Sequence, residues 1–155
     1  MDKKEFDLLA QLRKDSRRTL SQIGRDVEMP VSTVHDRMKK IKKGIIKKYT
    51  CILDFKSLGF NCRAQVVLRL HSKDDRGDIK EYLLKNQNVN SVYKINNGYD
   101  FLAELIFRDI SELDGFIDRL EERFKIREKK VYYIIDDVAR EVFLSDQVHA
   151  GLLGV

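Results

Sequence analysis

The feature that most constrains the fold of this chain is a change in the spacing of its apolar residues about a third of the way along. In residues 62–70, CRAQVVLRL, apolar and polar side chains alternate, as in a strand with one buried face. Before residue 44, apolar residues instead recur every three or four positions, as on one side of a helix. The two spacings predict two separately packed modules, and 155 residues suffice for two small domains.

The second module is predicted to contain four strands and two helices. The expected order is strand 62–71, helix 79–86, strand 89–95, strand 101–107, helix 111–124 and strand 130–135. Asn96, Asn97 and Gly98 should form the turn of a hairpin between the second and third strands. This β-α-β-β-α-β order is that of a ferredoxin-like domain, with both helices on one face of the sheet. The expected fold class of the whole chain is therefore α+β.

The first module is predicted to be a helix-turn-helix. A first helix follows a cap at Asp2, and a second covers about 20–27 after a cap at Thr19 or Ser21. Pro30 then suits the start of a third helix. Three short helices with a tight turn between the last two make a helix-turn-helix.

The third helix, residues 30–43, has the chemistry of a helix that enters the major groove of DNA. Its apolar residues, Val31, Val34, Met38 and Ile41, fall on one face. The other face begins with small polar residues and ends with lysines, and Gly44 should end the helix in the C′ position. A major groove admits such a helix, whose N-terminal turns then reach base edges. Taken alone, it could equally be a solvated surface helix.

The distribution of charge favours a polyanion as the partner of the first module. Residues 1–50 hold 14 basic and 7 acidic residues, a net charge of +7. The other 105 residues hold 16 basic and 18 acidic residues, a net charge of −2. The positive excess therefore lies entirely in the helical module, and we expect double-stranded DNA as its partner.

Candidate DNA contacts fall into two groups. Polar side chains near the helix start are predicted to lie at base edges, and cations on or near phosphates. The first group is Ser32, Thr33, His35 and Asp36; the second is Arg37, Lys39, Lys40 and Lys43, with Arg17 and Arg18 at the turn between the first two helices. Lys42, Lys47 and Lys48 are not distinguished from charges that only keep the chain in solution.

The predicted domain boundaries follow the changes of pattern. Residues 1–48 form the DNA-binding domain and residues 61–136 the ferredoxin-like domain. Residues 49–60 form an extended linker, within a segment rich in β-formers that could include a small wing. Residues 137–155 form a tail with too many apolar residues to remain fully exposed to solvent, and we expect it to pack on its own or on a neighbouring subunit.

Several classes of function lack their motifs here. Cys51 and Cys62 follow no metal-ligand spacing and are expected to be reduced, partly buried thiols. The sequence has no metal, cofactor or catalytic motif, and His71 lies in a polar segment expected to be a loop. No apolar run is long enough to span a membrane, and the acidic N-terminus is not a signal peptide. We therefore expect a cytoplasmic protein that is not an enzyme and has no membrane partner.

The residues and their order resemble the leucine-responsive/asparagine-regulator (Lrp/AsnC) family of prokaryotic transcription regulators. The strongest matches are LLAQLRKDSR, STVHDRMKKI ahead of Gly44, the turn NGYDF and the strand VYYIIDDV. The resemblance implies a winged-type helix-turn-helix joined to a ferredoxin-like effector and assembly domain. It also implies homodimers that assemble into tetramers or octamers, and an amino-acid effector bound between subunits, with no other cofactor.

The resemblance also implies an effector site. Its candidate residues are Gly98, Tyr99 and Asp100 at the hairpin turn, and Tyr132, Tyr133 and Ile134 on the last strand. Gly98 permits a turn geometry or a close backbone approach that a Cβ would block. Asp100 could accept hydrogen bonds from an α-ammonium group, while turn N–H groups hold a carboxylate. The alternative is a purely structural hairpin, in which Asp100 bonds only its neighbours.

Two other functions remain open. RNA-recognition domains share the β-α-β-β-α-β order, and residues 98–104, GYDFLAE, vaguely resemble their aromatic signature. Asn97 in place of a basic residue, the carboxylate of Asp100 and the negative net charge count against an RNA-binding sheet. A stand-alone amino-acid sensor would use the second module alone and would not need the basic first module.

Overall fold

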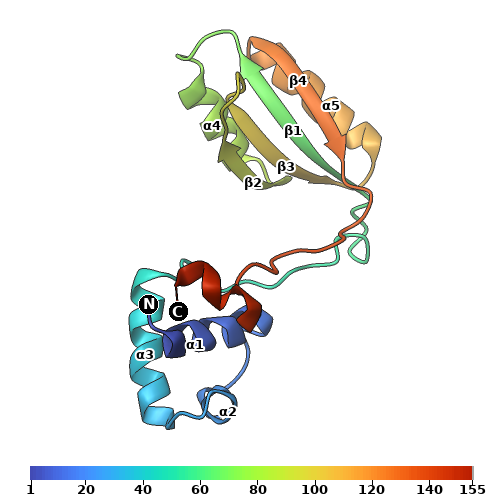
Figure 1. The fold of residues 1–155 in the computed structure, drawn as a ribbon. Helices are drawn as coiled ribbons and strands as arrows, with labels where there is room; N and C mark the ends of the chain where they lie inside the picture. Colours follow the sequence, from blue (N-terminus) through green and yellow to red (C-terminus); the bar gives the residue numbers. More distant parts are fainter. Residues whose placement is uncertain (155) are drawn as a thin grey trace. The chain divides into compact units, whose positions relative to one another are not determined.

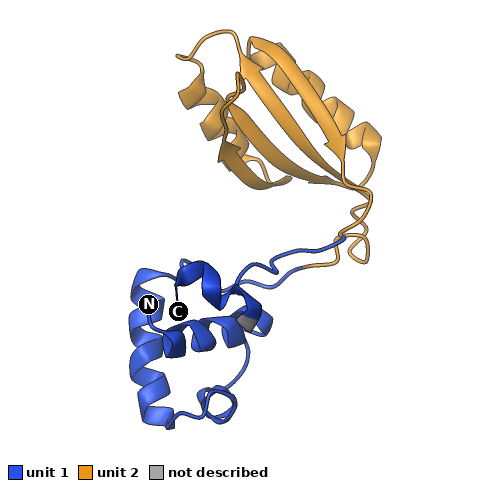
Figure 2. Cartoon of the chain, in the orientation of Figure 1, with its two compact units in different colours: residues 1–52, 138–155 blue, residues 53–137 orange. Residues whose placement is uncertain are grey.

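The structure, a computed structural model, describes residues 1–154 apart from the side chain of Gln147, and it divides into two compact units. Unit 1 contains residues 1–52 together with the chain from residue 138 onwards, and unit 2 contains residues 53–137 (Figure 2). The first unit is therefore built from both ends of the chain. No helix of the described residues has both the length and the apolar character needed to cross a membrane.

Unit 1 contains three helices, α1 (Lys3–Lys14), α2 (Leu20–Asp26) and α3 (Val31–Gly44) (Figure 1). The first two begin with capping boxes, in which the side chain of Asp2 or Thr19 accepts from the third helical N–H and that residue's side chain accepts in return. Their inward faces share one core with α3, made of Leu8, Leu9, Ile23, Met29, Val34, Met38 and Ile41. The helix-turn-helix predicted from the sequence is thus confirmed.

A glycine permits the tight turn between α2 and α3. A Cβ built on Gly24 would lie 2.7 Å from the carbonyl oxygen of Met29, closer than real Cβ atoms approach. The Met29 N–H donates to the Gly24 carbonyl at 2.8 Å, and Glu28 between them has a φ of 51°. The close approach of α2 to the turn therefore requires glycine at position 24.

The end of α3 differs from the expectation. Gly44 is the last helical residue and not a C′ terminator, because Ile45 continues in the right-handed region as the C-cap. The N–H groups of Ile45 and Ile46 both donate to the Ile41 carbonyl, and Ile46 packs on the core. No left-handed residue is needed when the chain is held in this way. Residues 45–61 form no strand, so the segment that could have included a small wing has no strand to build it.

The C-terminal segment packs on α1. The guanidinium of Arg13 donates to the Phe143 carbonyl at 3.1 Å, and to the carbonyl and carboxylate of Glu141 at 2.7 and 3.0 Å. Leu144 packs against the core of unit 1, and a 3₁₀ helix, η1 (Gln147–Leu153), follows. Glu141 and Leu144 have φ values of 56° and 58°, a strained region for such side chains, so tertiary contacts must hold them there.

Removing residues 138–155 is expected to lower the stability of unit 1 by about 2–4 kcal/mol, because Arg13 loses its partners and Leu144 leaves the core. Hydrogen exchange of the α1 amides should report the loss directly. A chain ending at Ala150 keeps the contacts of Arg13 and Leu144 and is the control. Equal protection of α1 in both shortened chains would show that these contacts contribute nothing.

Unit 2 is the predicted ferredoxin-like domain. Its elements are β1 (Cys62–Leu70), α4 (Arg76–Lys85), β2 (Val89–Lys94), β3 (Phe101–Phe107), α5 (Ile110–Arg123) and β4 (Ile126–Tyr133). The strands form an antiparallel sheet in the order β2-β3-β1-β4, and both helices cover one face of it (Figure 1). The core lies between, where alternate residues of β1 from Cys62 to Leu70 meet the buried stripe of α5 from Leu113 to Phe124.

Four details of the structure differ from the expectation. Helix α4 begins at Arg76, three residues before the expected start at residue 79. Strand β4 lies earlier than 130–135, because Ile126 already pairs with Leu70 and Tyr133 is the last residue to pair with β1. Helix α5 begins one residue early, since the side chain of Asp109 caps it by accepting from Glu112 N–H. Both cysteines are free, but Cys51 is exposed and only Cys62 is buried.

Candidate nucleic-acid interface and candidate effector turn

The outer face of α3 carries one straight row of polar and charged side chains. Val34, Met38 and Ile41 turn into the core, whereas Val31, which was predicted to share their face, is 46% exposed. The opposite side presents Ser32, Asp36, Lys39 and Lys43, at spacings of four, three and four residues that place them in line. Thr33 and Lys40 lie on one side of this row and His35 on the other, and all seven are exposed. The helix therefore offers its polar side to an external partner.

The chemistry of this row changes along the helix. Hydroxyls and the carboxylate of Asp36 come first, and they can accept or donate at base edges. The ring of His35 lies 3.4 Å from the Asp36 carboxylate, so these two side chains form one polar group. The lysines follow in the last two turns, where a cation suits the helix dipole and a phosphate suits the cation.

Arg37 lies apart from this row. Its guanidinium contacts the carboxylate of Asp2 at 2.5 Å and that of Glu5 at 3.8 Å, and so joins α3 to the start of α1. The hydrogen bond from Arg37 holds the pKa of the Asp2 carboxyl below its usual value. A phosphate contact by Arg37 stays a prediction, and it would require this side chain to leave its present partners.

The two arginines at the turn between α1 and α2 differ from each other. Arg18 is half-buried and pairs with Asp26 at 2.5 Å, while also donating to Gln11. Arg17 is exposed, and its backbone N–H donates to the Asp15 carboxylate. Arg17 is thus available to a phosphate, whereas Arg18 holds α1 and α2 together.

The candidate effector turn is a tight hairpin. Asn97 and Gly98 have φ values of 59° and 83°, and the Tyr99 N–H donates to the Asn96 carbonyl at 3.4 Å. Two successive positive φ values are those of a type I′ turn. A Cβ on Gly98 would meet nothing within 4 Å, so glycine is required here by the backbone conformation and not by a close approach.

Asp100 has partners within its own subunit. Its carboxylate accepts from the Leu70 N–H at 2.8 Å and from Arg76 at 2.5 and 2.7 Å, and the residue is only 7% exposed. Burial alone would raise the pKa of this carboxyl, but the Leu70 hydrogen bond and the Arg76 guanidinium outweigh burial and leave the pKa lowered. Asp100 therefore ties the hairpin to the end of β1 and the start of α4. An additional bond to an α-ammonium group stays a prediction.

Replacing Asp100 with asparagine is expected to destabilise unit 2 by about 2–3 kcal/mol at neutral pH, because Arg76 and the Leu70 N–H lose a charged acceptor. A lowered pKa means that the carboxylate's contribution is complete above its ordinary pKa of 3.8. The contribution disappears as the pH falls through the lowered pKa. Urea unfolding at neutral pH and near pH 2 should show the two proteins converging in acid. A constant difference between them would contradict this role.

The structure separates the two groups of candidate effector residues. Phe101, next to the turn, pairs with Leu68 near the end of β1, whereas Tyr133 pairs with Ala64 near its beginning. Four residues of strand, about 13 Å, lie between these points. Tyr132 lies on the sheet face away from the helices, Tyr133 on the helix side, and Ile134 beyond the strand, where its N–H donates to the Arg63 carbonyl. A ligand of the size of an amino acid could therefore not touch both groups within one subunit.

Other polar residues, which the sequence did not single out, surround the turn and the open sheet face. The Tyr99 hydroxyl donates to Glu128 at 2.7 Å, and the Lys130 ammonium lies 5.0 Å from the centre of the Tyr99 ring. Farther along the sheet, buried Glu104 accepts from Arg63 and from Asn90. Glu128 lies outside the strand expected at 130–135, and only its pairing with Arg69 shows that it shares a sheet face with Lys130.

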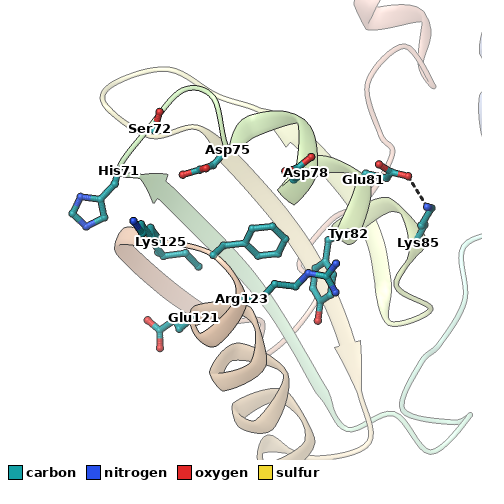
Figure 3. A pocket seen from close by; sticks show the side chains of 12 residues that line it. His71, Ser72, Asp75, Asp78, Glu81, Tyr82, Lys85, Glu121, Arg123 and Lys125 are labelled. Carbon is teal, nitrogen blue, oxygen red and sulfur yellow. Dashed lines mark hydrogen bonds and ion pairs between the residues drawn. The ribbon is translucent and has the colours of Figure 1, made fainter.

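A cleft in unit 2 lies elsewhere, between α4 and the end of α5, with a volume of about 1230 Å³ (Figure 3). Asp75 and Asp78 line its α4 side, and Arg123 and Lys125 line the other. It contains none of the candidate effector residues and is open and highly charged, unlike the mainly apolar pockets that hold small ligands. Among the described residues, no three His, Cys, Asp or Glu side chains gather as metal ligands.

Each of the two units matches the model of a known domain family. The model of the AsnC-type helix-turn-helix domain matches residues 1–42, and that of the Lrp/AsnC ligand binding domain matches residues 61–142. An uncharacterized HTH-type transcriptional regulator of Pyrococcus horikoshii is 32% identical over 120 residues, which are 76% of this chain and 77% of that protein. The HTH-type transcriptional regulator FL11 of Pyrococcus furiosus is 27% identical over 119 residues, 76% of each chain.

Solved structures show the same fold. The transcriptional regulator NMB0573 of Neisseria meningitidis, in complex with L-Met, superposes with a TM-score of 0.83 at 21% identity, covering 90% of this chain and 93% of that one. E. coli AsnC superposes with a TM-score of 0.79 at 19% identity, covering 90% and 95%.

Proposed function

Because the chain belongs to the Lrp/AsnC family, it is a DNA-binding transcription regulator with a ligand-binding domain and not an enzyme, and we propose that α3 is the helix through which it reads DNA. The observation that carries this proposal is the exposed row of Ser32, Asp36, Lys39 and Lys43 on the side of α3 opposite its buried apolar residues. Ser32, Thr33, His35 and Asp36 would meet base edges, and the lysines would meet phosphates. A DNA partner supports a cytoplasmic location for the protein.

We propose that the functional form is a homodimer built on the open face of the sheet. Val67 and Leu102 pair across β1 and β3 on this face, and Tyr93 and Tyr132 flank them with more than half of their surface exposed. Two copies would place two α3 helices in successive major grooves, about 34 Å apart on a pseudo-palindromic site. Assembly of dimers into tetramers or octamers would use other surfaces.

We propose an α-amino acid as the effector, bound between subunits. The turn at Gly98–Asp100 and the strand end at Tyr132–Ile134 are too far apart to meet in one subunit, which favours a shared site. The NMB0573 structure was solved with L-Met, and this supports the ligand class. An effector would act by binding one assembly state more tightly than another, because equal affinity for both shifts nothing.

Titration of labelled nucleic acids tests the DNA proposal. We expect the protein to bind duplex promoter fragments in preference to single-stranded RNA of the same sequence. Preference for RNA would support the alternative of an RNA-binding sheet, and binding of neither would support a stand-alone sensor.

A thermal-shift screen of the twenty amino acids tests the effector proposal, because a ligand that binds only the folded form raises its melting temperature. No shift with any amino acid would contradict it.

A further inference from the structure

The cations of unit 1 divide into two populations. Arg13, Arg18 and Arg37 each contact a carboxylate of the same unit. The stretch Lys39–Lys48 holds six lysines and no acidic residue. All six are exposed, and among the described residues no carboxylate lies within 4.0 Å of their ammonium groups. Arg13, Arg18 and Arg37 thus hold the unit together, and these six lysines remain available to an external anion.

The lysines extend beyond α3, and the segment that carries the last two is held in place. The N–H groups of Ile45 and Ile46 donate to the Ile41 carbonyl at 2.9 and 3.2 Å, and the Ile46 side chain packs on the core. The Lys42 ammonium lies 5.6 Å from the centre of the Tyr49 ring, within cation–π range. Residues 45–49 therefore form a short loop held against the end of α3, which we call the lysine loop.

We propose that the lysine loop is a second DNA contact, in which Lys47 and Lys48 bind backbone phosphates beside the groove that α3 enters. This inference rests on the proposed function of α3 and adds a site to it. The loop would do the work of a wing without any strand, since Ile46 and the Lys42–Tyr49 contact fix its position. Lysine is a point charge without bidentate geometry, so the contact would add affinity and not sequence preference.

The first test removes the two loop charges and measures the salt dependence of duplex binding. Each phosphate contact contributes about 0.9 to the slope of log K against log salt, so K47Q/K48Q should lower the slope by about 1.8 per subunit. K80Q/K125Q makes the same change of charge at two exposed lysines of unit 2 and should leave the slope nearly unchanged. Equal slopes for the two variants overturn the inference.

The second test asks whether Tyr49 acts by holding the loop. Y49L removes the ring beneath Lys42, and we expect it to weaken duplex binding several-fold in the otherwise unchanged protein. In the K47Q/K48Q background, the same substitution should have little further effect, because the charges that it positions are gone. An equal loss in both backgrounds overturns the positioning role.

The outcomes separate this inference from the function on which it rests. A protein that binds no duplex at all overturns both. A protein that binds duplex through Lys39, Lys40 and Lys43, but whose K47Q/K48Q variant keeps the parent slope, overturns only the lysine loop. Circular dichroism of each variant confirms that the helices remain, and these exposed side chains should not affect folding.

Discussion

Replacing Lys39, Lys40 and Lys43 with alanine is expected to remove most of the salt-dependent part of DNA affinity that α3 provides. The three side chains lie on the exposed face of the helix, and alanine is the strongest helix former, so α3 should persist. Three phosphate contacts correspond to a slope of about 2.7 per subunit, or about 5 in a dimer. Between about 50 and 200 mM salt, the fall in affinity should therefore be smaller by roughly a thousandfold.

Substitutions at the start of α3 provide the contrast. Ser32→Ala and Asp36→Asn change groups predicted to lie at base edges, so they should alter the preference among operator sequences and leave the salt slope nearly unchanged. Fluorescence anisotropy with one specific and one scrambled duplex, each at four salt concentrations or more, separates the two effects. An unchanged slope in the triple lysine variant would show that α3 does not carry the phosphate contacts.

The sequence predicts most of the architecture because the hydrophobic spacing is strong where elements are half-buried. The alternation from Cys62 to Leu70 and the stripe from Leu113 to Phe124 both correspond to buried faces. Caps are also local, and Asp2 and Thr19 act as such. The start of β4 was misplaced because the residues from Ile126 to Lys129 are mostly charged, and only pairing with β1 makes them a strand.

The candidate site was less predictable, because a charged residue's partner depends on contacts between distant parts of the chain. Arg37 pairs with Asp2, 35 positions away, and Asp100 accepts from Leu70, 30 positions away. Position on the helix face placed both Arg37 and Lys39 among the phosphate contacts, whereas in the structure Arg37 is paired with Asp2 and Lys39 is exposed. The same reason hid the contact of Arg13 with the C-terminal segment, 128 positions away.

Introducing a carboxylate on the open face of the sheet is expected to abolish the dimer and weaken binding to a two-half-site operator by at least a hundredfold. Tyr132→Asp would bury an unpaired charge in the proposed interface, although the residue is 54% exposed in one subunit and its replacement should leave the fold intact. A monomer carries only one α3 helix, so it loses the gain in affinity, about 10²–10⁴, that comes from binding two linked half-sites.

Tyr133 is the matched control, because successive strand residues point to opposite faces of a sheet. It is 45% exposed, but it lies on the helix side, so Tyr133→Asp should leave the dimer intact in the absence of effector. Analytical ultracentrifugation gives the number of subunits. Comparing the affinities for duplexes with one and with two half-sites gives the gain from binding both half-sites at once. If the Tyr132 variant stays dimeric, or if both variants dissociate equally, then the open face of the sheet is not what joins the subunits. The pairing of two α3 helices would then have to come from another surface.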